Sequence, residues 1–151
     1  MHVNHQLLLE ALKYYGTKEI PGDRNNPSIL KFFAIAGHQW VNSETTPWCS
    51  AFMCYVARQV KAEDTGSLRA RSWMSVRDAK SVLRIDDLIP GDITILWRGQ
   101  KDSAQGHVAL YVNSDDHYLY LLGGNQSNSV CIKRYPRYRF LEGRRLIAQP
   151  I

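Results

Sequence analysis

The spacing of the apolar residues changes part-way along the chain, and this change most constrains the fold. Up to about residue 60, apolar side chains recur at intervals of three and four, which is the period of an amphipathic helix. From about residue 90, the apolar segments are short, rich in β-branched and aromatic residues, and separated by turn signals such as Pro90-Gly91-Asp92. Helices followed by a strand meander predict an α+β fold, with N-terminal helices packed on an antiparallel β-sheet.

Turn and capping residues place the expected elements more closely. The first helix should end at Gly16, the second should have Asn26 as its N-cap and Pro27 as its first residue, and the third should begin near Thr46-Pro47. A short helix is expected over 72–80, and strands are expected over 93–97, 107–112, 118–122, 130–133 and 145–148.

Length and composition indicate one globular domain that spans 1–151. This length can bury a sizeable core, and no repeat or linker interrupts the chain. No apolar run approaches the ~20 residues of a membrane span. The N-terminus lacks the basic region and the uninterrupted apolar segment of a secretory signal, so we expect a protein made in the cytoplasm without a signal peptide. A net charge of +5 is compatible with polyanionic partners and equally with an ordinary solvated surface.

The three cysteines indicate reactive-thiol chemistry, since an odd number cannot all pair within the chain. No cysteine–histidine cluster has zinc spacing, so we predict neither a structural metal nor a disulfide framework. Cys49 falls in the first turn of the third helix, where exposed backbone N–H groups and the helix dipole favour the thiolate. Cys54 and Cys131 are interpreted as buried structural residues.

A histidine and an amide side chain are candidates to act with Cys49. His107 opens an apolar strand beside the loop Gly99–Gly106, which we expect to be flexible and to admit substrate. Asn125 lies where the next strand returns towards His107, and an amide oxygen can orient an imidazole as a carboxylate does. Gln126 is the rival for this role. The Gly123-Gly124 pair before them allows unusual backbone angles and close approach.

Further residues are candidates for binding the oxyanion or the substrate. The backbone N–H of Cys49 is the natural oxyanion donor at a helix start. Side chains that could contribute to this binding are Trp48, Ser50, Tyr111 and Gln126. For the aromatic residues core packing is the alternative, and we favour it for Trp48.

Five short motifs occur in order along the chain. They are Thr46-Pro47-Trp48-Cys49-Ser50-Ala51-Phe52, Ala70-Arg71-Ser72-Trp73, Pro90-Gly91-Asp92, Gly106-His107-Val108-Ala109 and Gly123-Gly124-Asn125-Gln126-Ser127. In this order the motifs resemble the NlpC/P60 and CHAP group of cell-wall hydrolases, above all its small phage-derived branch with Pro-Trp-Cys and Gly-Gly-Asn-Gln motifs. The resemblance covers about residues 12–145. Ala109 departs from the pattern, because a Gly is common there.

The resemblance implies a papain-like fold and hydrolysis of amide bonds in the stem peptides of peptidoglycan, without a metal or another cofactor. Cys49 would be the nucleophile, His107 the base and Asn125 the polar third residue. Several bonds fit such a triad: the D-Glu to diamino-acid bond, the sugar to L-Ala bond and the interpeptide crossbridge. The enzyme would act on the wall of a target or host cell, either as a secreted antibacterial effector or as a phage-type endolysin. An effector would also require a cognate immunity protein.

Two other functions remain open. Papain-like sites can also deamidate, crosslink or cleave proteins, so the target could be a protein of a host or target cell. A non-catalytic binding module is the second alternative, because the segment Lys133–Phe140 interleaves cations with aromatic residues. Such a pattern suits single-stranded nucleic acid, an anionic wall polymer or lipid headgroups. No nucleic-acid-binding fold motif accompanies it, so nucleic acid is disfavoured.

Overall fold

The structure, a computed structural model, describes residues 2–20, 25–38 and 47–147. The α-helices in this part are α1 (Val3–Leu12), α2 (Pro27–Ile35) and α3 (Cys49–Gln59). The strands are β1 (Ala79–Val82), β2 (Ile93–Trp97), β3 (Gly106–Ser114), β4 (Tyr118–Gln126), β5 (Ser129–Pro136) and β6 (Phe140–Leu146). Short 3-10 helices are η1 (Ala70–Ser75), η2 (Ile85–Asp87) and η3 (Arg137–Arg139).

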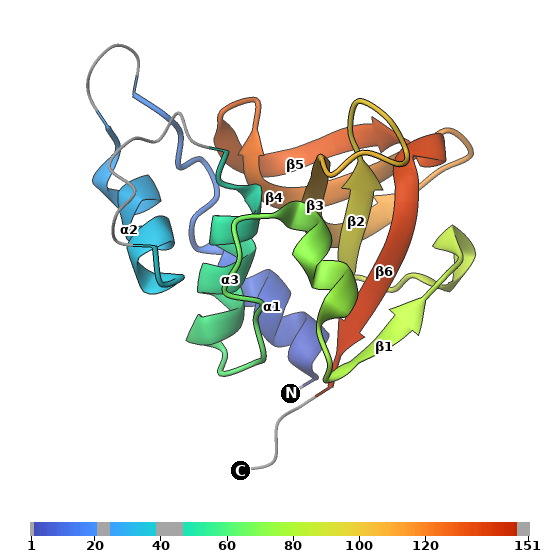
Figure 1. The fold of residues 1–151 in the computed structure, drawn as a ribbon, viewed down its shortest axis with the longest axis horizontal. Coiled ribbons are helices and arrows are strands. Elements are labelled where there is room, and N and C mark those ends of the chain that lie inside the picture. The colour runs from blue at the N-terminus through green and yellow to red at the C-terminus, as the bar shows by residue number, and fades with distance from the viewer. Residues whose placement is uncertain (1, 21–24, 39–46, 148–151) are drawn as a thin grey trace.

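The strands form one antiparallel sheet in the order β1-β6-β2-β3-β4-β5. The α-helices lie together beside this sheet, and α3 packs against β3 and β4 (Figure 1). The expected α+β class, with N-terminal helices on an antiparallel sheet, is therefore confirmed. No helix in the described ranges combines the length and the apolar character that a membrane crossing needs.

Local capping chemistry accounts for the helix boundaries. The side-chain oxygen of Asn26 accepts a hydrogen bond from the backbone N–H of Ser28 at 2.9 Å, and Pro27 is the first residue of α2, as predicted. The first helix ends at Leu12 and not at the predicted Gly16, which follows after a turn and has a φ of +89°. The third helix begins at Cys49 with Trp48 as its N-cap residue. The predicted cap Thr46 lies outside the described residues.

The elements between α3 and β2 differ from those predicted from the sequence. Instead of one helix over 72–80, the chain forms η1 and then the edge strand β1. This strand is mostly exposed and carries no alternating apolar pattern, so it exists through its pairing with β6. Strands β2 to β5 are present at the predicted positions, although β4 and β5 run several residues further than expected. The strand predicted over 145–148 overlaps β6 only at the last two residues of β6, which already begins at Phe140.

The sheet separates two apolar clusters, and their positions fix the site. The larger cluster lies on the helix side and includes Trp48, Phe52 and Val108. The smaller cluster includes Ala109 and Tyr111, together with Tyr135. Because alternate residues of a strand share a face, His107 lies on the face of Ala109 and Tyr111. Its neighbour Val108 points to the helices. The start of β3 therefore directs His107 and Val108 to opposite faces of the sheet, and Val108 lies on the face that α3 covers.

Candidate active site

Cys49 is held on a rigid element. Its side chain is 6% exposed, and every residue of α3 from Cys49 to Ala57 is buried. The preceding Trp48 is fully buried, and its indole N–H donates to Oε1 of Glu19 at 2.9 Å. The first turn of α3 therefore has no room to reorient, and the thiol keeps one position against the sheet.

Backbone amides approach the sulfur of Cys49 from two elements. Hydrogen bonds from the backbone of Val108 in β3 and of Ser50 in α3 favour the thiolate. The backbone N–H of Val108 is available to bond to the sulfur, because the pairing of β3 with β4 begins only at Leu110. Burial has the larger effect and raises the pKa of the Cys49 thiol above its ordinary value. The resting side chain is therefore a thiol that lies beside Val108, the neighbour of His107.

His107 is oriented by an amide side chain. Its Nε2 atom lies 2.9 Å from Oε1 of Gln126, and both residues are buried. The amide nitrogen of Gln126 donates to the backbone carbonyls of Leu121 at 3.1 Å and Cys131 at 2.6 Å. Because the nitrogen is committed to these carbonyls, the amide oxygen must accept the proton on Nε2. Nδ1 is therefore the nitrogen of His107 that is free to take a proton.

The imidazole of His107 is neutral at neutral pH. Burial lowers its pKa to about 4, and the cations of Arg139, Lys133 and Arg98 add to this effect, while the hydrogen bond to the amide oxygen opposes it. Since the pKa of Cys49 is raised, both shifts favour a neutral thiol with a neutral imidazole over a thiolate–imidazolium pair. Such a histidine can act as a general base during attack.

Tyr135 also contacts His107, although no sequence motif predicts it as a site residue. Its phenolic oxygen lies 3.1 Å from Nε2, and the two ring centroids are 5.1 Å apart with an interplanar angle of 34°. Burial raises the pKa of the phenol, so the hydroxyl stays protonated. The sequence signal at this position is an aromatic residue inside a run of cations, the pattern that carries the alternative of a binding module.

An irregularity in β4 determines which of the two amide side chains, Asn125 or Gln126, contacts His107. The pairing of β4 with β5 shifts register between Gly123 and Gln126, and Asn125 has a φ of +56°. This left-handed residue breaks the alternation of side chains that an ideal strand would have. The structure consequently places Gln126, and not Asn125, in the position predicted for the third residue.

The two glycines before this irregularity serve close packing. Neither has a φ in the left-handed region, so of the two properties that glycine allows there only close approach is used. A Cβ on Gly124 would lie 2.7 Å from the indole of Trp48, and one on Gly123 would lie 2.6 Å from Cβ of Ala109. The strand can therefore approach the start of α3 and the face of His107 only with glycine at both positions.

Trp48, Ser50 and Tyr111, which we predict to contribute to oxyanion or substrate binding, are buried and make contacts within the fold. The buried hydroxyl of Ser50 donates to the carbonyl of Ser67 at 2.6 Å and accepts from the indole of Trp73 at 3.1 Å. Trp48 belongs to the core, which was the alternative that we favoured. Tyr111 is buried in the smaller cluster, and its hydroxyl forms a hydrogen bond of 2.8 Å with the hydroxyl of Ser114. All three stabilise the fold around the site.

Arg71 fastens the loop Gly99–Gly106, which leads into β3. Its guanidinium donates to the carbonyls of Gln100 at 3.2 Å, Lys101 at 2.9 Å and Gln105 at 2.8 Å. We expected this loop to be flexible. Instead, the three hydrogen bonds from the Arg71 side chain hold the two ends of the loop together. The chain therefore enters β3, and reaches His107, from a fixed position.

No protein-family model and no curated protein matches the chain. Within the described ranges, no three side chains of His, Cys, Asp or Glu converge in a way that could hold a metal ion.

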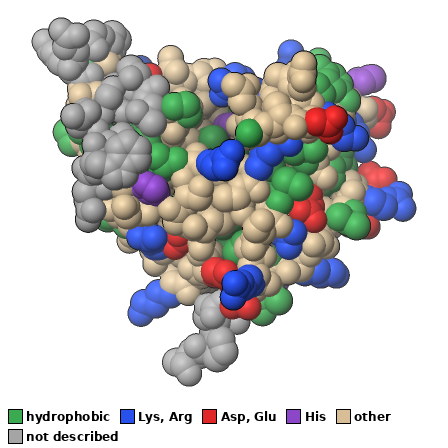
Figure 2. All heavy atoms as spheres, viewed as in Figure 1, with side chains coloured by type: hydrophobic (Ala, Val, Ile, Leu, Met, Phe, Trp, Pro, Cys, Tyr) green, Lys and Arg blue, Asp and Glu red, His purple; other side chains and the backbone are tan. Residues whose placement is uncertain are grey.

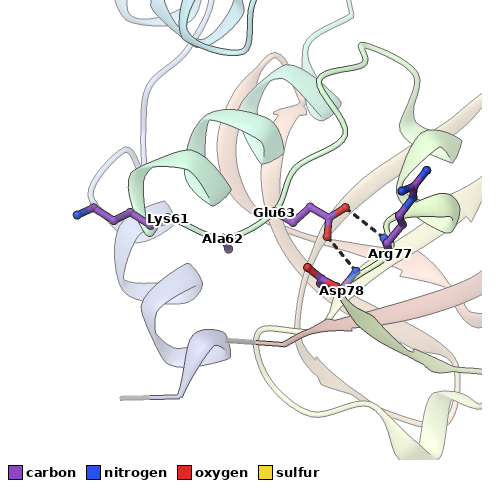
Figure 3. A pocket seen from close by; sticks show the side chains of 5 residues that line it. All are labelled: Lys61, Ala62, Glu63, Arg77 and Asp78. Atoms are coloured by element: carbon purple, nitrogen blue, oxygen red, sulfur yellow. Dashed lines mark hydrogen bonds between the residues drawn. The ribbon is translucent and has the colours of Figure 1, made fainter. Parts of the chain in front are cut away.

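A pocket of about 590 Å³ lies at the other end of α3 from Cys49 (Figure 3). It is lined in part by Glu63, whose carboxylate accepts the backbone N–H groups of Arg77 at 3.3 Å and Asp78 at 2.9 Å. With a rise of 1.5 Å per residue, the length of α3 puts roughly 16 Å between this pocket and the thiol. The carboxylate thus ties the segment before β1 to the end of α3 and takes no part in the site.

Proposed function

We propose that the chain is a papain-like cysteine hydrolase that cleaves amide bonds in the stem peptides of bacterial peptidoglycan. The observation that carries the proposal is the buried His107, whose Nε2 proton is held by Gln126 and whose neighbour in β3 contacts the thiol of Cys49. A cysteine at a helix start, a histidine on a strand and an amide that orients the histidine are the parts of Cys-His-Asn hydrolases.

The architecture and the motifs support the same proposal. In a papain-like arrangement, the helix that begins with the nucleophile packs against an antiparallel sheet that carries the base, and α3 packs in this way against β3 and β4. The five motifs that resemble the NlpC/P60 and CHAP group include both candidate catalytic residues. Gln126 would then fill the third position in place of Asn125, and its amide oxygen can do the same chemistry.

The proposed reaction proceeds through an acyl-enzyme. As Sγ of Cys49 bonds to the substrate carbonyl carbon, its proton passes to Nδ1 of His107. The backbone N–H of Cys49 stabilises the oxyanion. His107 then protonates the leaving nitrogen, the C–N bond breaks and a thioester remains. Water attacks the thioester and gives a proton to His107, which returns it to the sulfur as the new carboxylic acid leaves. Gln126 holds the Nε2 proton throughout.

The biological setting follows from the substrate. Peptidoglycan lies outside the cytoplasm, so the protein would act on the wall of a target or host cell after delivery or lysis. An antibacterial effector and a phage-type endolysin both fit this chemistry. An effector would need an immunity protein that covers Cys49 in the producing cell.

Incubation with isolated peptidoglycan tests the proposal. We expect wild type to release muropeptide fragments, whose masses identify the bond that is cut, and Cys49→Ala to release none. Cys54→Ala is the matched control, because Cys54 lies in the same helix and its sulfur makes long contacts of 3.8 Å with Thr65 and Ser67. Its fragments should match those of wild type.

Two results would overturn the proposal. One is release of the same fragments by Cys49→Ala. The other is intact wall after treatment with wild type under reducing conditions, on walls from several bacteria. Release of ammonia from protein glutamines would then support the deamidase alternative.

The structure weakens the case for a nucleic-acid surface on Lys133–Phe140. Tyr135 is buried against His107, Arg134 stacks on the ring of Tyr118 at 4.5 Å, and Arg137 pairs with Asp86 at 3.5 Å. These groups are therefore not free to stack on bases or to line a strand of phosphates. On the face seen in Figure 2, basic and acidic side chains are interspersed and form no continuous basic stripe.

A further inference from the structure

Tyr135 is buried, touches the imidazole of His107 and has no role in the reaction proposed for the site. We propose that it is a positioning residue, whose hydroxyl oxygen shares the Nε2 proton of His107 with Gln126. The shared proton keeps Nδ1 unprotonated and ready to take the proton of Cys49. This inference rests on the proposed function, because it gives the tyrosine a part in the same reaction.

Two oxygen atoms from different strands meet at one nitrogen of the histidine. The hydroxyl oxygen of Tyr135 in β5 lies 3.1 Å from Nε2 of His107, and Oε1 of Gln126 in β4 lies 2.9 Å from it. All three side chains are buried. The N–H group on Nε2 therefore has two acceptors within hydrogen-bond distance.

The glutamine determines the direction of the tyrosine contact. A phenol can either donate or accept a hydrogen bond. The amide nitrogen of Gln126 donates to two backbone carbonyls, so its oxygen faces Nε2 of His107 and requires a proton there. A protonated Nε2 has no lone pair with which to accept from a phenol. The hydroxyl of Tyr135 must therefore accept at Nε2, and its own proton must point elsewhere.

The ring of Tyr135 is held in place by its neighbours. Its centroid lies 5.1 Å from that of His107, and the two rings make an interplanar angle of 34°. The guanidinium of Arg139 lies 5.3 Å from the same centroid, and Nζ of Lys133 lies 5.8 Å from it. Arg139 is itself fixed by a hydrogen bond from its Nε to the carbonyl of Trp97 at 3.0 Å. These contacts keep the hydroxyl against Nε2.

The contact gains strength when His107 becomes charged. In the proposed reaction Nδ1 takes the proton of Cys49, and a charged N–H forms stronger hydrogen bonds than a neutral one. Burial disfavours this charge, since it lowers the pKa of His107 to about 4. A second acceptor on Nε2 thus stabilises a state that forms only along the reaction path. Its loss should consequently affect kcat more than KM.

Tyr135→Phe tests the proposal, because it keeps the ring and removes only the hydroxyl. On a stem peptide we expect kcat to fall roughly tenfold, the size of one hydrogen bond to a charged group, with KM changed by less than about threefold. Tyr55→Phe is the matched control. Tyr55 is also buried, but it lies in the other apolar cluster and its hydroxyl bonds to that of Tyr14 at 2.7 Å. This variant should keep the kcat of wild type.

Nuclear magnetic resonance of the ¹⁵N-labelled protein without substrate provides a second readout. At neutral pH the imidazole proton of His107 should be found on Nε2 in wild type. Its resonance should move upfield in Tyr135→Phe, because the proton loses one of two acceptors, and should stay in place in Tyr55→Phe. This resonance reports the contact itself and does not depend on any catalytic activity.

The outcomes separate the role of Tyr135 from the proposed function. If wild type cleaves the peptide, an undiminished kcat in Tyr135→Phe would overturn the role and leave the hydrolase standing. An unmoved Nε2 proton resonance would do the same, as would equal losses of kcat in Tyr135→Phe and Tyr55→Phe. A wild-type proton on Nδ1 of His107 would also overturn the role, because the phenol would then donate to Nε2. Absence of cleavage by wild type, with intact peptidoglycan, would instead overturn the proposed function itself.

Discussion

The amide oxygen of Gln126 lies 2.9 Å from Nε2 of His107, and two backbone carbonyls hold the amide nitrogen of the same side chain. The glutamine therefore has one orientation, and the histidine has one tautomer. In the proposed reaction Nδ1 of His107 is the base, so catalysis would depend on this contact, and we propose Gln126 as a positioning residue.

Replacement of Gln126 should lower kcat with little change in KM. For Gln126→Ala we expect a loss of about 10²-fold, because the imidazole can then turn and populate the wrong tautomer. The measurement is steady-state kinetics on a stem peptide, with circular dichroism to verify folding. Asn125→Gly is the control, since glycine readily adopts the φ of +56° found there, and it should retain activity within about threefold. A larger loss in Asn125→Gly than in Gln126→Ala would restore Asn125 as the third residue.

Protonation of His107 should make stability depend on pH. As the pH falls below 6.5, the unfolded imidazole takes a proton, whereas the buried one does not until about pH 4. The contribution of the neutral His107 to the free energy of unfolding should therefore be fully present above pH 6.5. It should fall by about 3 kcal/mol towards pH 4, at about 1.4 kcal/mol per pKa unit. Urea unfolding between pH 7.5 and pH 4 of wild type and His107→Gln measures this difference.

The comparison with His107→Gln isolates one residue. The other histidines and the carboxylates are present in both proteins, so their contributions cancel in the difference. If both proteins lose the same stability between pH 6.5 and pH 4, His107 titrates near its ordinary pKa, and the neutral resting pair is not supported.

The two catalytic candidates could be placed from the sequence because their signals are local. Cys49 follows a Pro-Trp pair at the start of an amphipathic stripe, and His107 follows a glycine at the start of an apolar strand. The helix α3 and the strand β3 begin at or within one residue of these positions. Local signals of this kind depend on residues only a few positions apart, so they do not require knowledge of the fold.

The third residue and Tyr135 could not be placed in this way. Gln126 faces His107 only because β4 changes register after Gly123, and that change depends on contacts with distant parts of the chain. Tyr135 lies 28 residues from His107 in sequence and reaches it across β4. Without the register of β4, counting alternate residues along the strand does not tell whether Asn125 or Gln126 faces His107.

Arg71 should control the order of the loop before the base. Arg71→Ala removes the hydrogen bonds to three loop carbonyls, so we expect faster tryptic cleavage after the exposed Lys101 and a fall in kcat of about tenfold, since a loosened base is less well positioned. Limited proteolysis followed by mass spectrometry gives the cleavage site. The exposed Arg69, without a guanidinium hydrogen bond in the described structure, provides the control Arg69→Ala. Equal cleavage rates at Lys101 in the two variants would show that Arg71 does not fasten the loop.

Gly123 and Ala109 should be energetically coupled. In Gly123→Ala the new Cβ would lie 2.6 Å from Cβ of Ala109, and we expect a loss of about 1–3 kcal/mol in the free energy of unfolding from this overpacking. Ala109→Gly removes the atom that is struck, so the double variant should be more stable than the sum of the single changes predicts, by about 1 kcal/mol. Gly124→Ala is the control, because its Cβ would meet Trp48 and Phe52 instead, and its effect should add to that of Ala109→Gly. If the effects of Gly123→Ala and Ala109→Gly also add, the two residues are not coupled. Gly123 would then not be required for the close approach of β4 to Ala109.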